Sequence, residues 1–161
     1  MKNYYIPYNY EGIYRPYVND IRAGASAFRA LNNVNTPLEA NNANKVRFQT
    51  EQYDLANEYD LNTSTFVPRE NGVYTLTSSV KFRPFNSGPY NLDIVFLITN
   101  KGETEGRDNE AFAGKRPGII TTSETLWLNA GDQVVVGMRS SINGMIQGDG
   151  STTFSAVKVF P

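Results

Sequence analysis

The chain has 161 residues, of which 40% are hydrophobic, so it is long enough to fold as one domain around its own core. A formal net charge of −1 provides no basic surface for nucleic acid, and the lack of both cysteine and histidine excludes disulfides, ordinary zinc sites and histidine-dependent nucleophilic catalysis. We therefore expect a protein that is not an enzyme and uses no cofactor, with neither a membrane span nor an apolar signal region.

Residues 1–22 differ in composition from the rest of the chain. Two prolines disfavour a helix there, and six tyrosines offer large contact areas with polar tips. The tyrosines are Tyr4, Tyr5, Tyr8, Tyr10, Tyr14 and Tyr17. We expect an arm that anchors a domain of residues 23–161 to a partner. The alternative is that the arm packs on its own domain as an irregular first strand.

The remaining sequence consists of short segments rich in Val, Ile, Phe, Tyr and Thr, separated by Gly, Asn and Pro, which is typical of β-sandwiches. In residues 72–82 apolar side chains alternate with Thr, Ser and Lys, so one face of that strand should be buried and the other wet. Strands are predicted at residues 25–31, 45–49, 65–68, 72–82, 90–100, 119–128, 133–138 and 153–160.

Two of these strands, residues 90–100 and 133–138, carry apolar side chains on both faces. A small antiparallel sandwich does not cover both faces of a strand by itself, so a partner subunit is expected to cover the second one. Loops or the arm could provide the same cover within one chain. The residues predicted at the subunit contact are Val95, Leu97, Trp127, Val135 and Met138.

Residues 101–118 are charged and rich in glycine, which predicts a long exposed loop. Together with residues 142–151 it supplies the candidate binding residues, which are Lys101, Arg107, Lys115, Arg116, Asn143 and Asp149. Acidic residues of these loops could offer oxygen ligands to calcium, but they lack the spacing of a calcium loop, so we favour solvated acidic loops. Asp132, in a Gly-Asp turn, is expected to fix that turn by accepting backbone N–H bonds.

Several segments in order resemble the globular head of complement C1q and its tumour-necrosis-factor-like relatives. The matching segments are SAFRA at 26–30, VRF at 46–48, TFVP at 65–68, NGVY at 71–74, LWLNAGDQV at 126–134 and TFSA at 153–156. The resemblance implies an all-β, ten-stranded antiparallel jelly-roll sandwich that forms a homotrimer and binds without catalysing. The chain differs from C1q in having no collagen-like repeat.

These observations lead to two functional hypotheses. The first is a trimeric structural or recognition module on the surface of a larger particle, such as a spore outer layer or a phage virion, attached through its arm. The second is a free, extracellular trimer that binds a receptor or a glycan through its loops.

Overall fold

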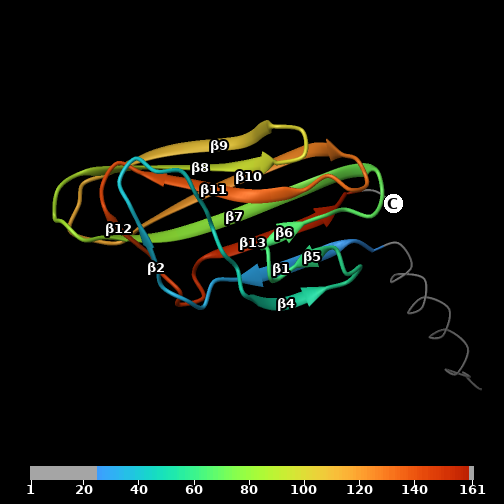
Figure 1. Ribbon diagram of the computed structural model, residues 1–161, viewed down its shortest axis with the longest axis horizontal. Helices are drawn as coiled ribbons and strands as arrows, with labels where there is room; N and C mark the ends of the chain where they lie inside the picture. The colour runs from blue at the N-terminus through green and yellow to red at the C-terminus, as the bar shows by residue number, and fades with distance from the viewer. Residues whose placement is uncertain (1–24, 160–161) are drawn as a thin grey trace, which may run out of the picture.

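The computed structural model describes residues 25–159 as two antiparallel β-sheets packed face to face (Figure 1). One sheet has seven strands in the order β2-β12-β7-β13-β1-β4, with β10 also paired to β7. Its strands are β1 (Ala27–Leu31), β2 (Thr36–Leu38), β4 (Thr50–Asp54), β7 (Gly72–Pro84), β10 (Gly118–Leu128), β12 (Gly144–Ile146) and β13 (Thr153–Lys158). The prediction of an all-β jelly roll is confirmed.

The second sheet has six strands in the order β5-β6-β11-β8-β9, with β3 also paired to β11. They are β3 (Asn44–Lys45), β5 (Tyr59–Asp60), β6 (Thr65–Phe66), β8 (Tyr90–Ile98), β9 (Glu103–Phe112) and β11 (Val134–Ser140). Thirteen strands are thus present in the described residues, three of them only two residues long. No helix among these residues is long and apolar enough to cross a membrane.

Aromatic side chains from both sheets form the centre of the core. Strand β7 alternates buried and half-buried residues as predicted, and its buried members face the opposite sheet. Phe154 of β13 is fully buried, and its ring lies 5.0 Å from that of Phe28, 5.6 Å from that of Phe48 and 5.8 Å from that of Phe96. The two sheets are therefore held together by contacts between residues far apart in the sequence.

The prediction of a long loop at residues 101–118 is wrong, because most of this segment forms strand β9 (Glu103–Phe112). This strand lies at the edge of the six-stranded sheet and pairs only with β8. Most of its residues are exposed or half-buried, and Glu103, Glu105, Asp108 and Glu110 give it a strongly acidic composition. Charged residues are common on edge strands, where they discourage pairing with another chain, so polar composition here indicates an edge rather than a loop.

The strand predicted at residues 45–49 is also wrong in extent, because β3 ends at Lys45. Val46 and Phe48 nevertheless lie in the core, fully buried, and the Val46 backbone N–H donates to the carbonyl of Val136 at 2.9 Å. The apolar alternation therefore predicted the buried residues correctly, although the backbone beyond Lys45 does not continue as a regular β-strand.

The molecule has two distinct ends. At the proximal end the first and last described strands meet, where the Lys158 backbone N–H donates to the carbonyl of Ser26 at 2.9 Å. At the distal end lie the turns that connect β7 to β8 and β9 to β10; in Figure 1 the proximal end is on the right. The six tyrosines of residues 1–22 lie outside the described residues, so their predicted role stays a prediction.

Candidate functional site

The outward surface of the seven-stranded sheet, which we name the hydroxyl face, carries a row of hydroxyl groups along β7 and β10. On β7 and β10 three pairs of side chains hydrogen-bond across the two strands. The pairs are Thr75–Thr125 at 2.9 Å, Thr77–Ser123 at 3.1 Å and Ser79–Thr121 at 2.8 Å between their oxygen atoms. The six side chains are short, so this surface is flat, and each of their hydroxyls has a hydrogen-bond partner within the sheet. The alternating Thr and Ser of the two strands was the sequence signal for it.

Apolar side chains collect at the proximal end of the hydroxyl face. Trp127 of β10 is 59% exposed, Val157 of β13 is 47% exposed, and Val159 just beyond it is 40% exposed. Val73, which pairs with Trp127 across β7 and β10, is half-buried. More than half of Trp127 is therefore uncovered within the described chain, although its indole N–H donates to Asn129 Oδ1 at 3.0 Å. These four residues form an apolar patch, which we name the proximal patch, and exposed apolar patches of this kind are suited to contact another protein.

The other four residues predicted at a subunit contact lie on the six-stranded sheet. Met138 faces the core together with Val134 and Val136, because these residues share one side of the strand, and it is 2% exposed. Val135 is on the outward side but only 4% exposed. The expectation that Val135 and Met138 lack cover within one chain is therefore wrong.

Val95 and Leu97 are half-buried on the outward surface of the six-stranded sheet, away from Trp127. The structure thus separates the predicted contact residues: Trp127 lies on one outward surface of the sandwich, Val95, Leu97 and Val135 lie on the other, and Met138 lies in the core. Their part in a trimer contact stays a prediction.

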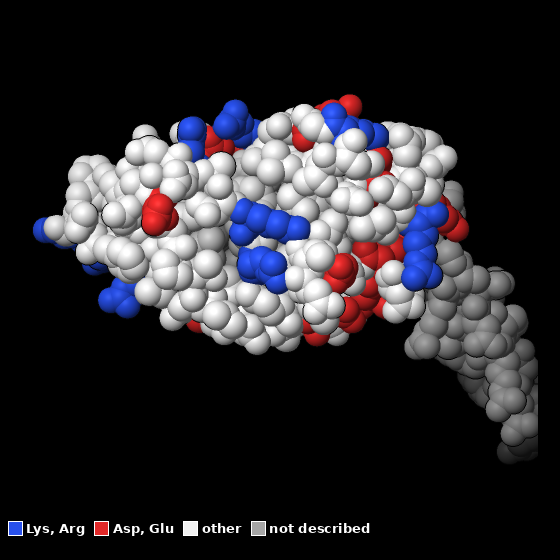
Figure 2. Space-filling model, viewed as in Figure 1, with Lys and Arg blue, Asp and Glu red and all other residues white. Residues whose placement is uncertain are grey.

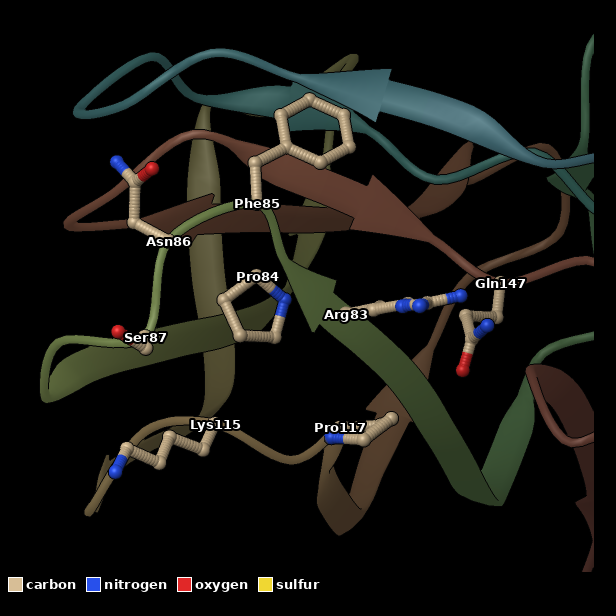
Figure 3. Close-up of a pocket in the computed structure, with 8 residues that line it drawn as sticks. All are labelled: Arg83, Pro84, Phe85, Asn86, Ser87, Lys115, Pro117 and Gln147. Carbon is tan, nitrogen blue, oxygen red and sulfur yellow. The ribbon is translucent and has the colours of Figure 1, made fainter.

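A pocket of about 380 Å³ opens at the distal end (Figure 3). It is lined by Arg83, Pro84, Phe85, Asn86, Ser87, Lys115, Pro117 and Gln147, so the end of β7, the two distal turns and the residue after β12 build it. Figure 3 shows Arg83 extending toward Gln147, whereas Phe85 and Lys115 point in other directions. Phe85 is 58% exposed. The lining includes two cationic side chains and no carboxylate, so the pocket favours anionic or neutral ligands.

The predicted binding residues do not form one site. Lys115 lines the distal pocket, and Arg116 lies beside it, where its carbonyl accepts a hydrogen bond from the Tyr90 hydroxyl at 3.0 Å. Asn143 uses its side-chain oxygen to accept from the Ala40 backbone N–H at 2.7 Å. Arg116 and Asn143 therefore make contacts that stabilise turns at the distal end. Phe85 was missed because it lies between the strands predicted at residues 72–82 and 90–100, outside the two segments that were predicted to supply binding residues.

Lys101 and Asp132 form a turn-stabilising pair at the proximal end. The Lys101 ammonium lies 2.7 Å from Asp132 Oδ2, which also accepts from the Asn129 backbone N–H at 2.8 Å. Burial alone would raise the pKa of Asp132, but the hydrogen bonds from Lys101, Asn129 and Asn100 outweigh it and hold the pKa below its ordinary value. Asp132 thus fixes the turn as expected.

Asp149 has its carboxylate engaged with the protein. Its oxygens accept from the Lys81 ammonium at 2.5 Å and from the Ser151 backbone N–H at 3.0 Å. Within residues 25–159 no three acidic side chains gather closely enough to hold a metal ion. We therefore expect Asp149 to stabilise the turn between β12 and β13.

The hydrogen bonds from Lys81 and Ser151 lower the pKa of Asp149 from 3.8 to about 2. Because the folded pKa is depressed, the stabilisation is complete above pH 3.8 and is lost as the pH falls through about 2. We expect Lys81→Met to raise the pKa of Asp149 toward 3.8, measured by carboxyl-carbon NMR titration. Lys101→Met, which removes a lysine that pairs with Asp132, should leave it unchanged. An unchanged titration in Lys81→Met would contradict the assignment.

The chain is similar to known proteins both in its sequence profile and in its structure. A sequence profile of the C1q domain matches residues 27–157. Among solved structures, the globular domain of zebrafish complement 1qA matches with a TM-score of 0.63 and 14% identity, over 84% of this chain and 98% of that one. Murine APRIL at pH 5.0 matches with a TM-score of 0.65 and 15% identity, over 84% of this chain and 99% of that one.

Eiger TNF from S. frugiperda matches with a TM-score of 0.61 and 14% identity, over 84% of this chain and 93% of the other. No curated protein matches the sequence. Sequence identities this low show only that the structures share a fold. The C1q-domain profile is the stronger comparison, because it matches most of the chain.

Proposed function

The chain belongs to the C1q domain family, and from that membership we propose that it works as a homotrimeric, non-enzymatic recognition or structural module. The observation that carries the proposal is the uncovered hydroxyl face with its exposed Trp127 and Val157. A flat sheet surface with satisfied hydroxyls and apolar groups at one end can be buried against another copy without leaving an unpaired polar group.

In the proposed trimer the proximal patch of each copy lies against its neighbours. Trp127, Val157 and Val159 together provide the aromatic and aliphatic contacts that commonly dominate binding energy at interfaces. The distal pocket lies at the other end of the molecule and stays accessible. This arrangement separates the surface that assembles the protein from the surface that faces its surroundings.

We further propose that residues 1–22 attach the trimer to a larger particle, such as a spore outer layer or a phage virion. Six tyrosines in this segment supply contact area, and three copies of the segment per trimer would multiply weak contacts through their high effective concentration. The described chain begins at Ala25, next to the proximal patch, so the three attachment segments would leave the trimer at its proximal end.

The attachment proposal predicts the behaviour of a truncated protein. Residues 23–161 should still fold and keep the same number of subunits as the full chain, because the core and turns described above use only residues from Ala25 onward. Recovery of the truncated protein with the purified particle should be lost. Normal recovery would exclude attachment through this segment, and dissociation into monomers would show that the segment belongs to the fold.

A second function is favoured by the distal pocket, which combines an exposed Phe85 with the cationic Arg83 and Lys115. In this alternative the protein is a free extracellular trimer that binds a receptor or a glycan through its distal turns. Phe85→Ala would then abolish ligand binding while leaving recovery with any particle unchanged. Comparing this variant with the truncated protein of residues 23–161 therefore separates the two functions.

A further inference from the structure

A groove of about 310 Å³ crosses the outward surface of the six-stranded sheet, far from the hydroxyl face. Val95 and Leu97 of β8 form its apolar floor together with Gly137 of β11. A Cβ atom added to Gly137 would lie 3.0 Å from Leu97 and 3.1 Å from Val95. The glycine therefore keeps the floor open between those two side chains.

Cationic side chains surround this apolar floor. Arg107 donates from Nε and Nη2 to the two oxygens of Asp93, at 3.0 and 2.9 Å, and Arg139 donates from Nη2 at 3.2 Å. Asp93 is 7% exposed, whereas the side chains of Arg107 and Arg139 are 61% and 52% exposed. One buried carboxylate thus positions two arginines whose other N–H groups remain available for a ligand.

The direction of Arg107 depends on a bulge in β9. Ile94 pairs with Asp108 and Phe96 pairs with Glu105, so Gly106 and Arg107 together lie opposite Val95. Gly106 has a φ of +55°, and its carbonyl accepts a hydrogen bond from the Thr122 hydroxyl. A bulge with glycine in this conformation turns the following side chain out of the regular alternation, here toward Asp93.

The charges lining the groove do not cancel. Lys45, Arg107 and Arg139 are cationic and Asp93 is the only carboxylate among its lining residues. The Lys45 ammonium donates to Thr65 Oγ1 at 3.0 Å, outside the groove, so the two arginines supply the positive charge that a ligand in the groove would meet first. Figure 2 shows Lys and Arg side chains at the middle of the visible face and along several of its edges, whereas most of the Asp and Glu surface lies toward its right-hand end. The excess positive charge favours an anion over a neutral ligand.

We propose that this groove binds a small organic carboxylate with an apolar chain or ring. The carboxylate pairs with the free N–H groups of Arg139 and Arg107, and the apolar body lies over Val95, Leu97 and Gly137. The groove is built from residues of one chain, so this binding depends neither on the trimer nor on attachment to a particle.

The test uses hexanoate and two matched probes, acetate and hexanamide, with amide NMR of the full chain. Hexanoate should shift the Gly137 and Val95 resonances saturably, whereas acetate lacks the apolar chain, hexanamide lacks the charge, and each should bind at least about tenfold more weakly. Hexanamide binding as well as hexanoate, or no saturable shift at these residues up to about 10 mM hexanoate, would overturn the proposal.

Arg139→Gln keeps a polar side chain and should lower the affinity for hexanoate about tenfold. Arg29→Gln removes an exposed arginine from β1 of the other sheet and should leave the affinity unchanged. Equal affinities in the two variants would contradict a role for Arg139. Light scattering on Arg139→Gln gives a second criterion, because a fall in oligomeric mass would assign this surface to a subunit contact and overturn the proposal.

Discussion

Replacing Val157 by Glu is expected to convert the proposed trimer into 18.0-kDa monomers at roughly micromolar concentration. Val157 is 47% exposed within one chain and belongs to the proximal patch, where it pairs with Ala27 of β1 and Thr75 of β7. In the trimer each carboxylate would lose water without gaining a partner, which is among the most costly changes at an interface. Light scattering or sedimentation measures the mass directly.

The matched control is Val34→Glu, in the turn between β1 and β2. Val34 is 52% exposed, so the two variants change the same residue type at similar exposure. Val34→Glu should keep the mass of the unchanged protein, and both variants should keep a β-type far-ultraviolet spectrum. If Val157→Glu stays trimeric, the hydroxyl face is not the subunit contact; if the unchanged protein is monomeric, the proposed trimer does not exist.

Phe154→Ala is expected to destabilise the domain by about 3–5 kcal/mol, a large share of the roughly 5–15 kcal/mol that stabilises a domain. Phe154 is fully buried, and its ring contacts aromatic rings from both sheets, so its removal leaves a cavity at the centre of the sandwich. Denaturant unfolding at one fixed protein concentration measures the effect, because the stability of an oligomer depends on concentration.

Phe85→Ala supplies the comparison, since it removes the same ring from a position that is 58% exposed. Its effect on the free energy of unfolding should stay within about 1 kcal/mol. Similar losses in both variants would mean that the sandwich is not held together by the ring cluster around Phe154.

The sequence predicted the fold correctly where a strand buries only one of its two faces, and where a turn is determined by a few neighbouring residues. The alternation in residues 72–82 gave the long strand β7, and Asn129 to Asp132 gave a turn whose Gly131 has a φ of +86°. Such features depend on neighbouring residues only, so the pattern along the chain contains them.

The errors have a different physical origin, since they concern partners far away in the chain. Strand β9 was missed because its pairing with β8 fixes its conformation while its exposed edge position keeps it polar. Met138 was assigned to the wrong side because apolar residues occur on both sides of β11. The groove could not be predicted, because Asp93, Arg107 and Arg139 meet only after β8, β9 and β11 pair.

The meeting of the first and last strands at the proximal end determines how the domain resists mechanical force. Strand β1 lies between β13 and β4, antiparallel to both, with Phe28 opposite Ala156. A tether at the start of β1 and a load on the distal turns pull along the strands, so the hydrogen bonds between β1 and its neighbours are stretched together. A load on both ends of the described chain would instead open the pair of β1 and β13 one bond at a time. A domain attached through its N-terminal segment and loaded at its distal end would therefore be pulled in its mechanically stronger direction.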